Sequence, residues 1–298
     1  MVDGQTVPGA VGVCLQKSKF LSRYGEVTML VVACIKQVPD TTQVQIDPVT
    51  NTLVREGIPF IMNPYDTNAL EEALRLKDRF GFRVAALSMG PPNAEATLRK
   101  AKALGADEVI LLSDRVFGGA DTLATSNVLT EAINKLAKSE EIAFIICGKQ
   151  TIDGDTAQVG PGIATRLGCP QLTLVDRIEE VDLKAKRVKV RRKLEGRHEL
   201  VEAPLPAVLT VVREVNRPRY PTVPMRLDAA DCTVTVWSNA VLRLDEVTVG
   251  LKGSPTWVTK IFSPQRDKGE IIGDGINDPE GTASLLIDKL LSKDVLAI

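Results

Sequence analysis

Residues Phe144–Ala164 read FIICGKQTIDGDTAQVGPGIA and contain the three features that decide the fold. An apolar run stops at Gly148, a polar loop follows, and a segment with helical spacing begins after the loop. This order predicts a strand, a loop large enough to hold a phosphate, and a helix N-terminus. Free backbone N–H groups and the positive end of the helix dipole favour an anion there, so we expect a nucleotide phosphate.

The same loop also carries two acidic residues, Asp153 and Asp155. Because their carboxylates would repel a phosphate, we assign them to helix capping or to a sugar hydroxyl. The loop matches neither GxxxxGK[ST] nor GxGxxG, and taken alone it is explained better by an ordinary strand-to-helix turn rich in Gly and Asp. The rest of the chain has to distinguish these two interpretations.

Composition limits the classes of partner. The 298 residues include 37 basic, 38 acidic and only 4% aromatic residues. This balance gives no broad positive surface for nucleic acid or an anionic membrane, and few rings for base stacking. No apolar run is long enough to cross a bilayer, so we expect no direct membrane insertion. We expect a cytoplasmic protein whose partners are small molecules or proteins, and no nucleic acid.

The number and spacing of the cysteines and histidine do not indicate catalysis by a side chain. The five cysteines have no CxxC spacing, and two lie in apolar strand-like runs, which is typical of buried reduced thiols. The single histidine, His198, lies in a charged stretch and is interpreted as a solvated surface imidazole. One histidine excludes His-based metal clusters and argues against a Ser-His-Asp site. We expect no metal ligands and no catalytic acid, base or nucleophile.

Apolar and amphipathic segments alternate over residues 29–232, whereas residues 1–28 lack the apolar core of a signal peptide and are expected to be a poorly ordered extension. The expected elements are a strand at 29–35, a hairpin around 43–55, a helix capped by Asp66 and stopped by Gly81, a strand at 82–88, a helix at 96–104, a strand at 108–112, a helix ending near 137 and the strand before Gly148. This order predicts an α/β fold with a doubly wound, mainly parallel sheet, a Rossmann-like adenine-nucleotide-binding domain.

Ligands of doubly wound sheets bind beyond the carboxyl ends of the strands, where the connections reverse direction. If the first and fourth strands are the adjacent central pair, residues 34–36, 63–66, 89–91 and 148–160 converge on one crevice. This geometric hypothesis favours a nucleotide site over an ordinary turn.

The chain changes character after Pro170. Segments at 172–176, 188–192 and 207–212 suit antiparallel strands at the edge of the sheet. Residues 216–225 hold three prolines, which favour an extended, presented loop. Tyr220 and Val223 in this loop indicate a protein-docking surface, and a plain linker is the alternative.

Strand and helix alternation is lost from Thr233. Residues 233–298 are expected to form a C-terminal arm that ends in an amphipathic helix at 280–291. Trp257 and Phe262 lie in a loop-like stretch with little local structure to bury them. An arm that embraces a partner subunit would bury them better.

Six motifs carry a resemblance to a known family. They are CIKQVPD (34–40), MNPYD (62–66), LSMGPP (87–92), GADEVIL (105–111), CGKQTIDGDTAQVGP (147–161) and VRRKLEGRHELVEAPLPAVLT (190–210). In this order they resemble the β subunit of electron-transfer flavoproteins, from Met29 to the C-terminus. One position departs, because Arg197 stands where a small or acidic residue is more usual. The resemblance implies a heterodimer with an α subunit that carries FAD, and a second nucleotide at the switch-point loop.

The ordinary type of this family holds a structural AMP there, whereas the electron-bifurcating type holds a second FAD that NADH reduces. The chain resembles the bifurcating type at DGDTAQVGP (153–161), at FGGADTLATS (117–126) and at GSPTWVTKIFSPQ (253–265). The implied function passes electrons from NADH to ferredoxin and to a high-potential acceptor, an acyl-CoA dehydrogenase or a quinone-reducing flavoprotein. The alternatives are an ordinary β subunit with AMP, and a non-redox adenine-nucleotide-binding module.

The resemblance also implies nucleotide contacts from several segments. Thr156 can donate to a phosphate, Gly160 lets the backbone approach the ligand, and Asn63 can read an adenine edge. Thr122 and Thr125 would meet the longer ligand. The expected cofactor-binding residues are Cys34, Asn63, Asp66, Met89, Thr122, Thr125, Gly148, Asp153, Thr156, Gln158, Val159 and Gly160.

Overall fold

The computed structural model describes residues 29–40, 45–46, 53–54, 59–259 and 269–295. These residues divide into two units, the first ending at Trp257 and the second beginning at Val258. The expected N-terminal extension and Phe262 lie outside the described residues. The expected hairpin is confirmed where its backbone is described, because β3 (Gln45–Ile46) pairs antiparallel with β4 (Leu53–Val54).

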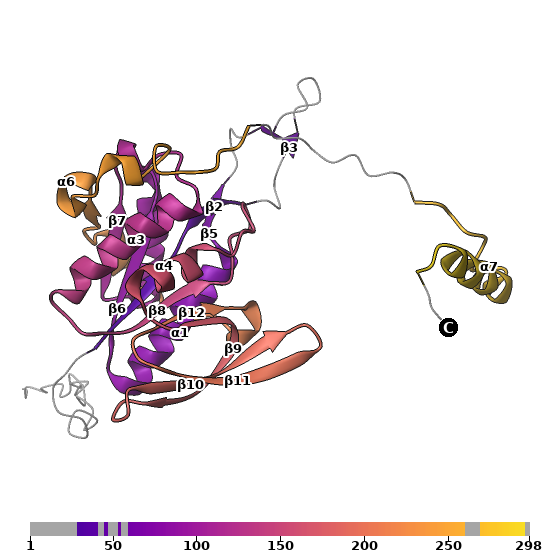
Figure 1. The fold of residues 1–298 in the computed structure, drawn as a ribbon, viewed down its shortest axis with the longest axis horizontal. Helices are drawn as coiled ribbons and strands as arrows, with labels where there is room; N and C mark the ends of the chain where they lie inside the picture. The colour runs from indigo at the N-terminus through magenta and orange to yellow at the C-terminus, as the bar shows by residue number, and fades with distance from the viewer. Residues whose placement is uncertain (1–28, 41–44, 47–52, 55–58, 260–268, 296–298) are drawn as a thin grey trace, which may run out of the picture. The chain divides into compact units, whose positions relative to one another are not determined.

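A nine-stranded sheet forms the centre of the first unit (Figure 1). From edge to edge its strands are β11 (Arg197–Pro204), β10 (Arg187–Leu194), β9 (Gln171–Asp182), β12 (Ala207–Val211), β8 (Ile142–Gly148), β1 (Leu30–Cys34), β6 (Arg83–Met89), β7 (Glu108–Leu112) and β13 (Thr235–Trp237). All neighbours from β9 to β13 in this order are parallel, and β10 is antiparallel to β9 and β11. The predicted doubly wound, mainly parallel α/β fold is therefore confirmed.

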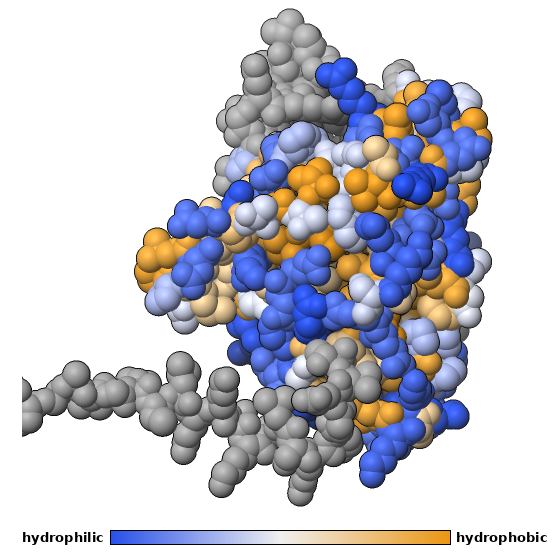
Figure 2. Space-filling view, turned by 90° about the vertical axis from the view of Figure 1, so that its left-hand side faces the viewer, coloured by the Kyte–Doolittle hydropathy of each residue, from blue (hydrophilic) through white to orange (hydrophobic). Residues whose placement is uncertain are grey.

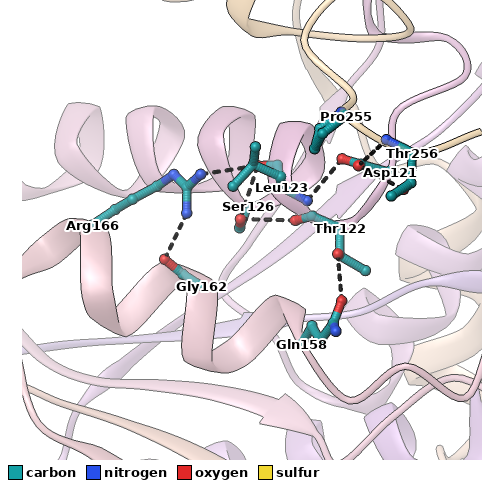
Figure 3. A pocket seen from close by; sticks show the side chains of 9 residues that line it. All are labelled: Asp121, Thr122, Leu123, Ser126, Gln158, Gly162, Arg166, Pro255 and Thr256. Carbon is teal, nitrogen blue, oxygen red and sulfur yellow. Dashed lines mark hydrogen bonds between the residues drawn. The ribbon is translucent and has the colours of Figure 1, made fainter.

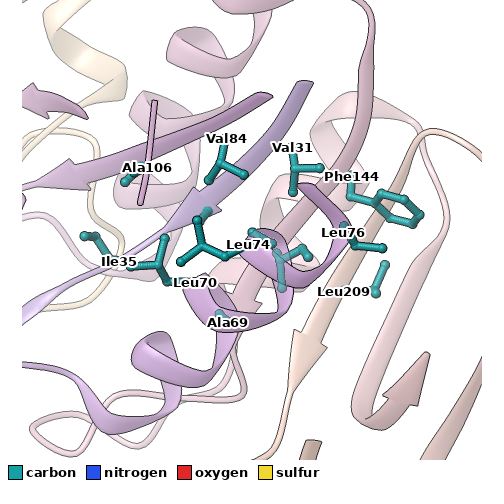
Figure 4. Close-up of a cluster of buried hydrophobic side chains, with 14 of the residues drawn as sticks. Val31, Ile35, Ala69, Leu70, Leu74, Leu76, Val84, Ala106, Phe144 and Leu209 are labelled. Atoms are coloured by element: carbon teal, nitrogen blue, oxygen red, sulfur yellow. The ribbon is translucent and has the colours of Figure 1, made fainter. Parts of the chain in front are cut away.

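Helices cover both faces of the sheet. α1 (Pro64–Phe80) and α2 (Glu95–Leu104) pack on one face, and α3 (Thr122–Ala137) and α4 (Val159–Leu167) pack on the other. Leu70 and Leu74 lie one turn apart on α1 and point toward Val31 and Val84 of the sheet (Figure 4). Because both faces are covered, the central strands carry nearly continuous apolar runs, as parallel sheets require.

Shorter elements join the main ones. β2 (Gln37–Pro39) follows β1 and pairs antiparallel with β5 (Phe60–Met62). The remaining elements of the first unit are the 3₁₀ helices η3 (Pro92–Ala94), η4 (Arg115–Phe117), η5 (Arg213–Val215) and η6 (Glu246–Thr248), and the short helices α5 (Val223–Ala230) and α6 (Asn239–Leu242).

The start of α1 differs from the prediction. The helix begins at Pro64, with Asn63 in the cap position and no side-chain cap. Asp66 is therefore in the first turn, and it is buried rather than capping. The reason is that Pro64 already suits the first helical position, because its fixed φ and missing N–H cost nothing there.

The prediction that residues 207–212 form an antiparallel edge strand is wrong. β12 lies inside the sheet, parallel to both β8 and β9, and all five of its residues are buried. Five apolar residues in a row are typical of such a central strand. The edge is instead β11, which the sequence analysis did not predict because charged residues interrupt its alternation.

The expected loss of alternation at Thr233 is not observed, since β13 pairs parallel with β7 and α6 follows it. In the proline-rich loop, Tyr220 is 94% exposed and Val223 is 70% exposed, as expected. The last residues of that loop, from Val223, form the first turn of α5.

The second unit contains α7 (Pro279–Ser292), which confirms the predicted C-terminal helix. None of the residues described in α7 is buried within this chain. Among the described helices, none has both the length and the apolar character that spanning a membrane would require. On the face drawn in Figure 2, hydrophilic residues cover most of the surface and hydrophobic residues form smaller groups between them.

Candidate functional site

The switch point of the sheet lies between β1 and β8. The chain runs from β1 to β6 and β7 on one side and returns through β8 on the other. Cys34 at the end of β1 is paired in register with Cys147 of β8. The hypothesis that the first and fourth strands are the adjacent central pair is confirmed. The ends of both strands, the start of α1 and the loop after β8 are joined here by hydrogen bonds, at the place where we expect the nucleotide crevice.

Asp66 ties the two central strands together at this crevice. Its carboxylate accepts the backbone N–H of Lys36 at 2.8 Å and that of Gly148 at 3.1 Å. Burial raises the pKa of Asp66 to about 7, although hydrogen bonds from Asn63, Lys36 and Gly148 act in the opposite direction. Both carboxylate oxygens thus have partners within the chain, and the residue holds the strand ends at a fixed spacing.

Asn63 holds the loop after β8. Its Nδ2 donates to the carbonyl of Gln150 at 2.9 Å, and its Oδ1 accepts the N–H of Ile152 at 3.3 Å. The residue is completely buried. Our expectation that Asn63 reads an adenine edge does not match this arrangement, because the side-chain amide is already used by the loop.

The two acidic residues of the loop have partners of their own. Lys36 Nζ lies 2.7 Å from the Asp153 carboxylate, and Gln150 Nε2 donates to Asp155 at 2.6 Å. Burial raises the pKa of Asp153, but the hydrogen bonds from Lys36 and Thr151 and the charge of Lys36 lower it more, so the net shift is downward. Neither carboxylate caps α4, so that part of our expectation is wrong. Their charges are instead offset or hydrogen-bonded, which weakens their repulsion of a phosphate.

The loop reaches α4 through strained backbone. Asp155 and Ala157 both have left-handed backbone, with φ of 51° and 56°. This conformation costs an ordinary residue about 1 kcal/mol or more, and such strain collects at ligand-binding sites. α4 begins at Val159 without a side-chain cap, and Thr156 is exposed just before it. The backbone amides at this helix start and the Thr156 hydroxyl are therefore free to donate to a phosphate.

Two glycines of α4 serve packing. A Cβ at Gly160 would lie 2.4 Å from the Thr210 methyl carbon on β12, and a Cβ at Gly162 would lie 2.7 Å from Ser126 Oγ on α3. The space beside Gly160 is therefore filled by Thr210. We expected Gly160 to let the backbone approach a ligand, and this expectation is wrong. The missing side chain instead lets α4 pack closely on the sheet.

A pocket of about 350 Å³ lies between the starts of α3 and α4 (Figure 3). Thr122 Oγ1 donates to Gln158 Oε1 at 2.8 Å, so two residues predicted as cofactor contacts meet although they are far apart in sequence. The Arg166 guanidinium donates to the carbonyls of Gly162 and Leu123. The residues that line the pocket are Asp121, Thr122, Leu123, Ser126, Gln158, Gly162, Arg166, Pro255 and Thr256.

Asp121 fixes the rim of this pocket. It accepts the backbone N–H groups of Leu123 and Ala124 and so caps α3. It also accepts the N–H and the hydroxyl of Thr256, which ties the chain after η6 to the start of α3. Burial raises the pKa of Asp121, but these hydrogen bonds lower it more, so the carboxylate stays ionised near neutral pH.

The remaining predicted residues fall into two groups. Cys34, Met89, Gly148 and Val159 lie at the strand ends or at the start of α4, around the crevice. Thr125 lies one turn into α3 and does not line the pocket. The sequence analysis named the segments that contain Lys36, Asp121 and Thr256 but did not include these three residues among the expected contacts. The pattern GGADT signals a helix cap and could have identified Asp121, whereas the other two depend on tertiary contacts.

The prediction of buried thiols is confirmed for Cys34 and Cys147, whereas Cys169 and Cys232 are partly exposed and Cys14 lies outside the described residues. Cys34 and Cys147 are buried free thiols, and the hydrogen bond with Cys34, together with burial, raises the pKa of Cys147 well above its ordinary value. His198 is half exposed on β11, with Nε2 3.2 Å from the Asp176 carboxylate. Asp176 also accepts two hydrogen bonds from Arg191, so this cluster joins strands of the antiparallel edge.

The fold and the strand order together define a doubly wound α/β protein whose central sheet has its switch point between β1 and β8. The model of the electron transfer flavoprotein domain matches residues 50–242. The chain belongs to the electron transfer flavoprotein family and is a β subunit with a role in electron transfer. β subunits of this family pair with an α subunit.

Several curated relatives match nearly the whole chain. Protein FixA of Azotobacter vinelandii is 48% identical over 265 residues, 88% of this chain and 94% of the relative. The electron transfer flavoprotein subunit beta of Clostridium acetobutylicum is 47% identical over 263 residues, 88% of this chain and 98% of the relative. The caffeyl-CoA reductase-Etf complex subunit CarD of Acetobacterium woodii is 45% identical over 271 residues, 90% of this chain and 100% of the relative.

Proposed function

We propose that this β subunit holds FAD in the switch-point crevice and accepts a hydride there from NADH, for electron bifurcation to ferredoxin and to a high-potential acceptor. When bound, FAD would supply the redox chemistry. The chain would bind and orient it, and no side chain would have to act as acid, base or nucleophile. We also propose a cytoplasmic location for this reaction.

The observation that carries the proposal is the pocket beside the crevice. Thr122 and Gln158 lie at its rim, and the pocket continues from the start of α4 toward Pro255 and Thr256. Its volume of about 350 Å³ is within the usual range for small-molecule sites. A mononucleotide at the start of α4 would leave this space empty, whereas the longer FAD could extend into it.

The chain's own residues suit such a ligand in two respects. The uncapped start of α4 and Thr156 supply donors for a pyrophosphate. Lys36 offsets the charge of Asp153, which would otherwise oppose an anion. The other predicted contacts, including Met89 and Thr125, remain part of this proposal.

The proposed protein partners rest on the name of one relative and on the exposed side chains of the proline-rich loop. The name of CarD places a relative in a complex with a reductase. The exposed Tyr220 and Val223 offer an apolar surface for a comparable partner of this chain, an acyl-CoA dehydrogenase or a quinone-reducing flavoprotein. Ferredoxin would accept the second electron.

One observation favours the ordinary function with AMP. Thr122 and Gln158, which both line the pocket, are joined by a hydrogen bond just before α4 begins, where a longer ligand would have to pass (Figure 3). If these side chains stay paired, the crevice holds only a mononucleotide, and the subunit shuttles electrons from dehydrogenases without reacting with NADH.

A count of released nucleotides tests the proposal. We expect the purified heterodimer to release two FAD on denaturation, and NADH to bleach the flavin absorbance of the native complex. One FAD and one AMP, with no bleaching, would establish the ordinary type instead. A colourless heterodimer that binds ATP and ignores NADH would point to a non-redox nucleotide-binding module.

A further inference from the structure

Two functional loops leave the sheet from neighbouring strand ends. β8 leads into residues 149–158, the nucleotide loop, and β12 leads into residues 213–225, the docking segment. Gly148 is paired in register with Val211, and Lys149 N donates to the Val211 carbonyl at 2.8 Å. The two loops therefore start side by side, although more than sixty residues separate them in sequence.

The start of α1 supports both loops with buried polar side chains. Asn63 and Asp66 hold the nucleotide loop and the end of β8, as described above. Further along the same helix, three more polar residues are less than 10% exposed and contact the docking segment, namely Asn68, Glu71 and Glu72. Burying polar groups is costly unless they are hydrogen-bonded, so these residues fix the loops in place.

The docking segment is held by charged and amide groups. Asn68 Nδ2 donates to Asn216 Oδ1 at 2.9 Å, and Asn216 Nδ2 donates back to the Asn68 carbonyl at 2.9 Å. Arg219 donates to Glu71 from its backbone N–H at 3.0 Å and from Nε at 2.8 Å, and its Nη2 lies 2.7 Å from Asp78. Tyr220 follows this anchor directly and projects into solvent.

Tyr65 lies where both loops begin. A Cβ at Gly148 would lie 2.6 Å from Tyr65 Cβ, so the first residue after the buried part of β8 packs directly on this tyrosine. The Arg213 guanidinium lies 4.9 Å from the centre of the Tyr65 ring, a cation–π contact at the first residue of the docking segment. Tyr65 thus lies against the end of β8, from which the nucleotide loop starts, and against the first residue of the docking segment.

We propose that α1 couples the crevice to the docking segment, with Tyr65 as the positioning residue, so that a nucleotide in the crevice slows opening of residues 213–220. This inference rests on the proposed nucleotide site. A ligand that orders the nucleotide loop restricts the first turn of α1, and the docking segment then opens less often. Because coupling is reciprocal, a partner bound at Tyr220 and Val223 would tighten nucleotide binding by the same factor.

Hydrogen exchange on the full heterodimer tests this coupling. The nucleotide-depleted complex is compared before and after FAD is added back, with the peptide that contains the Arg219 amide as the readout. We expect exchange in this peptide to slow by about fivefold or more. Tyr65→Leu should abolish the slowing while FAD still binds, whereas Tyr65→Phe keeps the ring and should preserve it. FAD also rebinds to the α subunit in this experiment. It does so in the parent and in both variants, so its effect cancels when the three heterodimers are compared.

The outcomes separate this inference from the proposed function. Equal slowing in the Tyr65→Leu protein, or no slowing in a parent heterodimer that binds two FAD, would overturn the coupling alone. A parent heterodimer that takes up one FAD and neither AMP nor a second FAD would overturn the nucleotide site and the coupling together.

Discussion

Asp66 gives the crevice a defined pH dependence. Its pKa is raised from 3.8 in the unfolded chain to about 7 in the folded protein. Between these values the folded state binds more protons, so the free energy of unfolding falls as the pH rises from about 4 to about 7. We expect this residue to lower the stability by roughly 3 kcal/mol over that range. Asp66→Asn should remove this contribution, measured by urea unfolding at several pH values. If the stability of the variant depended on pH as that of the parent does, the pH dependence would not come from Asp66.

Sequence patterns indicated which residues lie at the strand ends but not which groups these residues contact. The asparagine and aspartate of MNPYD and the glycine after Val159 were expected to touch a ligand. In the structure Asn63 binds the nucleotide loop, Asp66 bridges two strands, and Gly160 faces Thr210. Asn, Asp and Gly are frequent where several backbone segments meet at the strand ends, so their presence in the sequence indicates such a place. Whether a ligand or another part of the protein lies beside such a residue depends on tertiary packing, and the sequence pattern does not predict that packing.

At the scale of elements, the packing of α4 on β12 depends on a glycine and a threonine. Gly160→Ala would place a methyl group 2.4 Å from the Thr210 methyl carbon, so we expect a loss of about 1–3 kcal/mol of stability. Thr210→Ser removes the methyl group and keeps the hydroxyl that accepts the Leu174 N–H. The double variant should therefore recover most of the loss, measured by chemical unfolding of all four proteins. A Gly160→Ala protein as stable as the parent would show that this contact is not close.

The elements with strong periodicity were predictable, and the others were not. Strands β1, β6, β7 and β8 and helices α1 to α3 agree with their apolar runs and stripes, and the hypothesis that β1 lies beside β8 is confirmed. β12 was assigned to the edge because charged strands precede it, yet its five buried residues suit the sheet interior. β11 was missed because charged residues interrupt its alternation, and β13 was missed because it has only three residues. Short strands of this kind carry little signal in their own residues.

At the scale of the whole molecule, the sequence predicted a nucleotide-binding domain and an arm, and the structure divides the chain between Trp257 and Val258. Every strand pair of the nine-stranded sheet lies before that point. Beyond it, large apolar side chains are exposed, with Ile271 at 92% and Ile276 at 91%. Surfaces of this kind are normally covered by a partner.

We therefore predict that a protein ending at Trp257 keeps the fold of the first unit but no longer copurifies with the α subunit. The full-length chain expressed alone should self-associate through its exposed apolar residues, whereas the shortened chain should associate less and unfold cooperatively at a similar temperature. Sedimentation and thermal unfolding of both chains measure these properties. As a matched control, Leu285→Ser and Ile287→Ser in the full-length chain should weaken pairing without changing its unfolding temperature, because both side chains are about half exposed. A shortened chain that still binds the α subunit as tightly would place the main interface on the first unit instead.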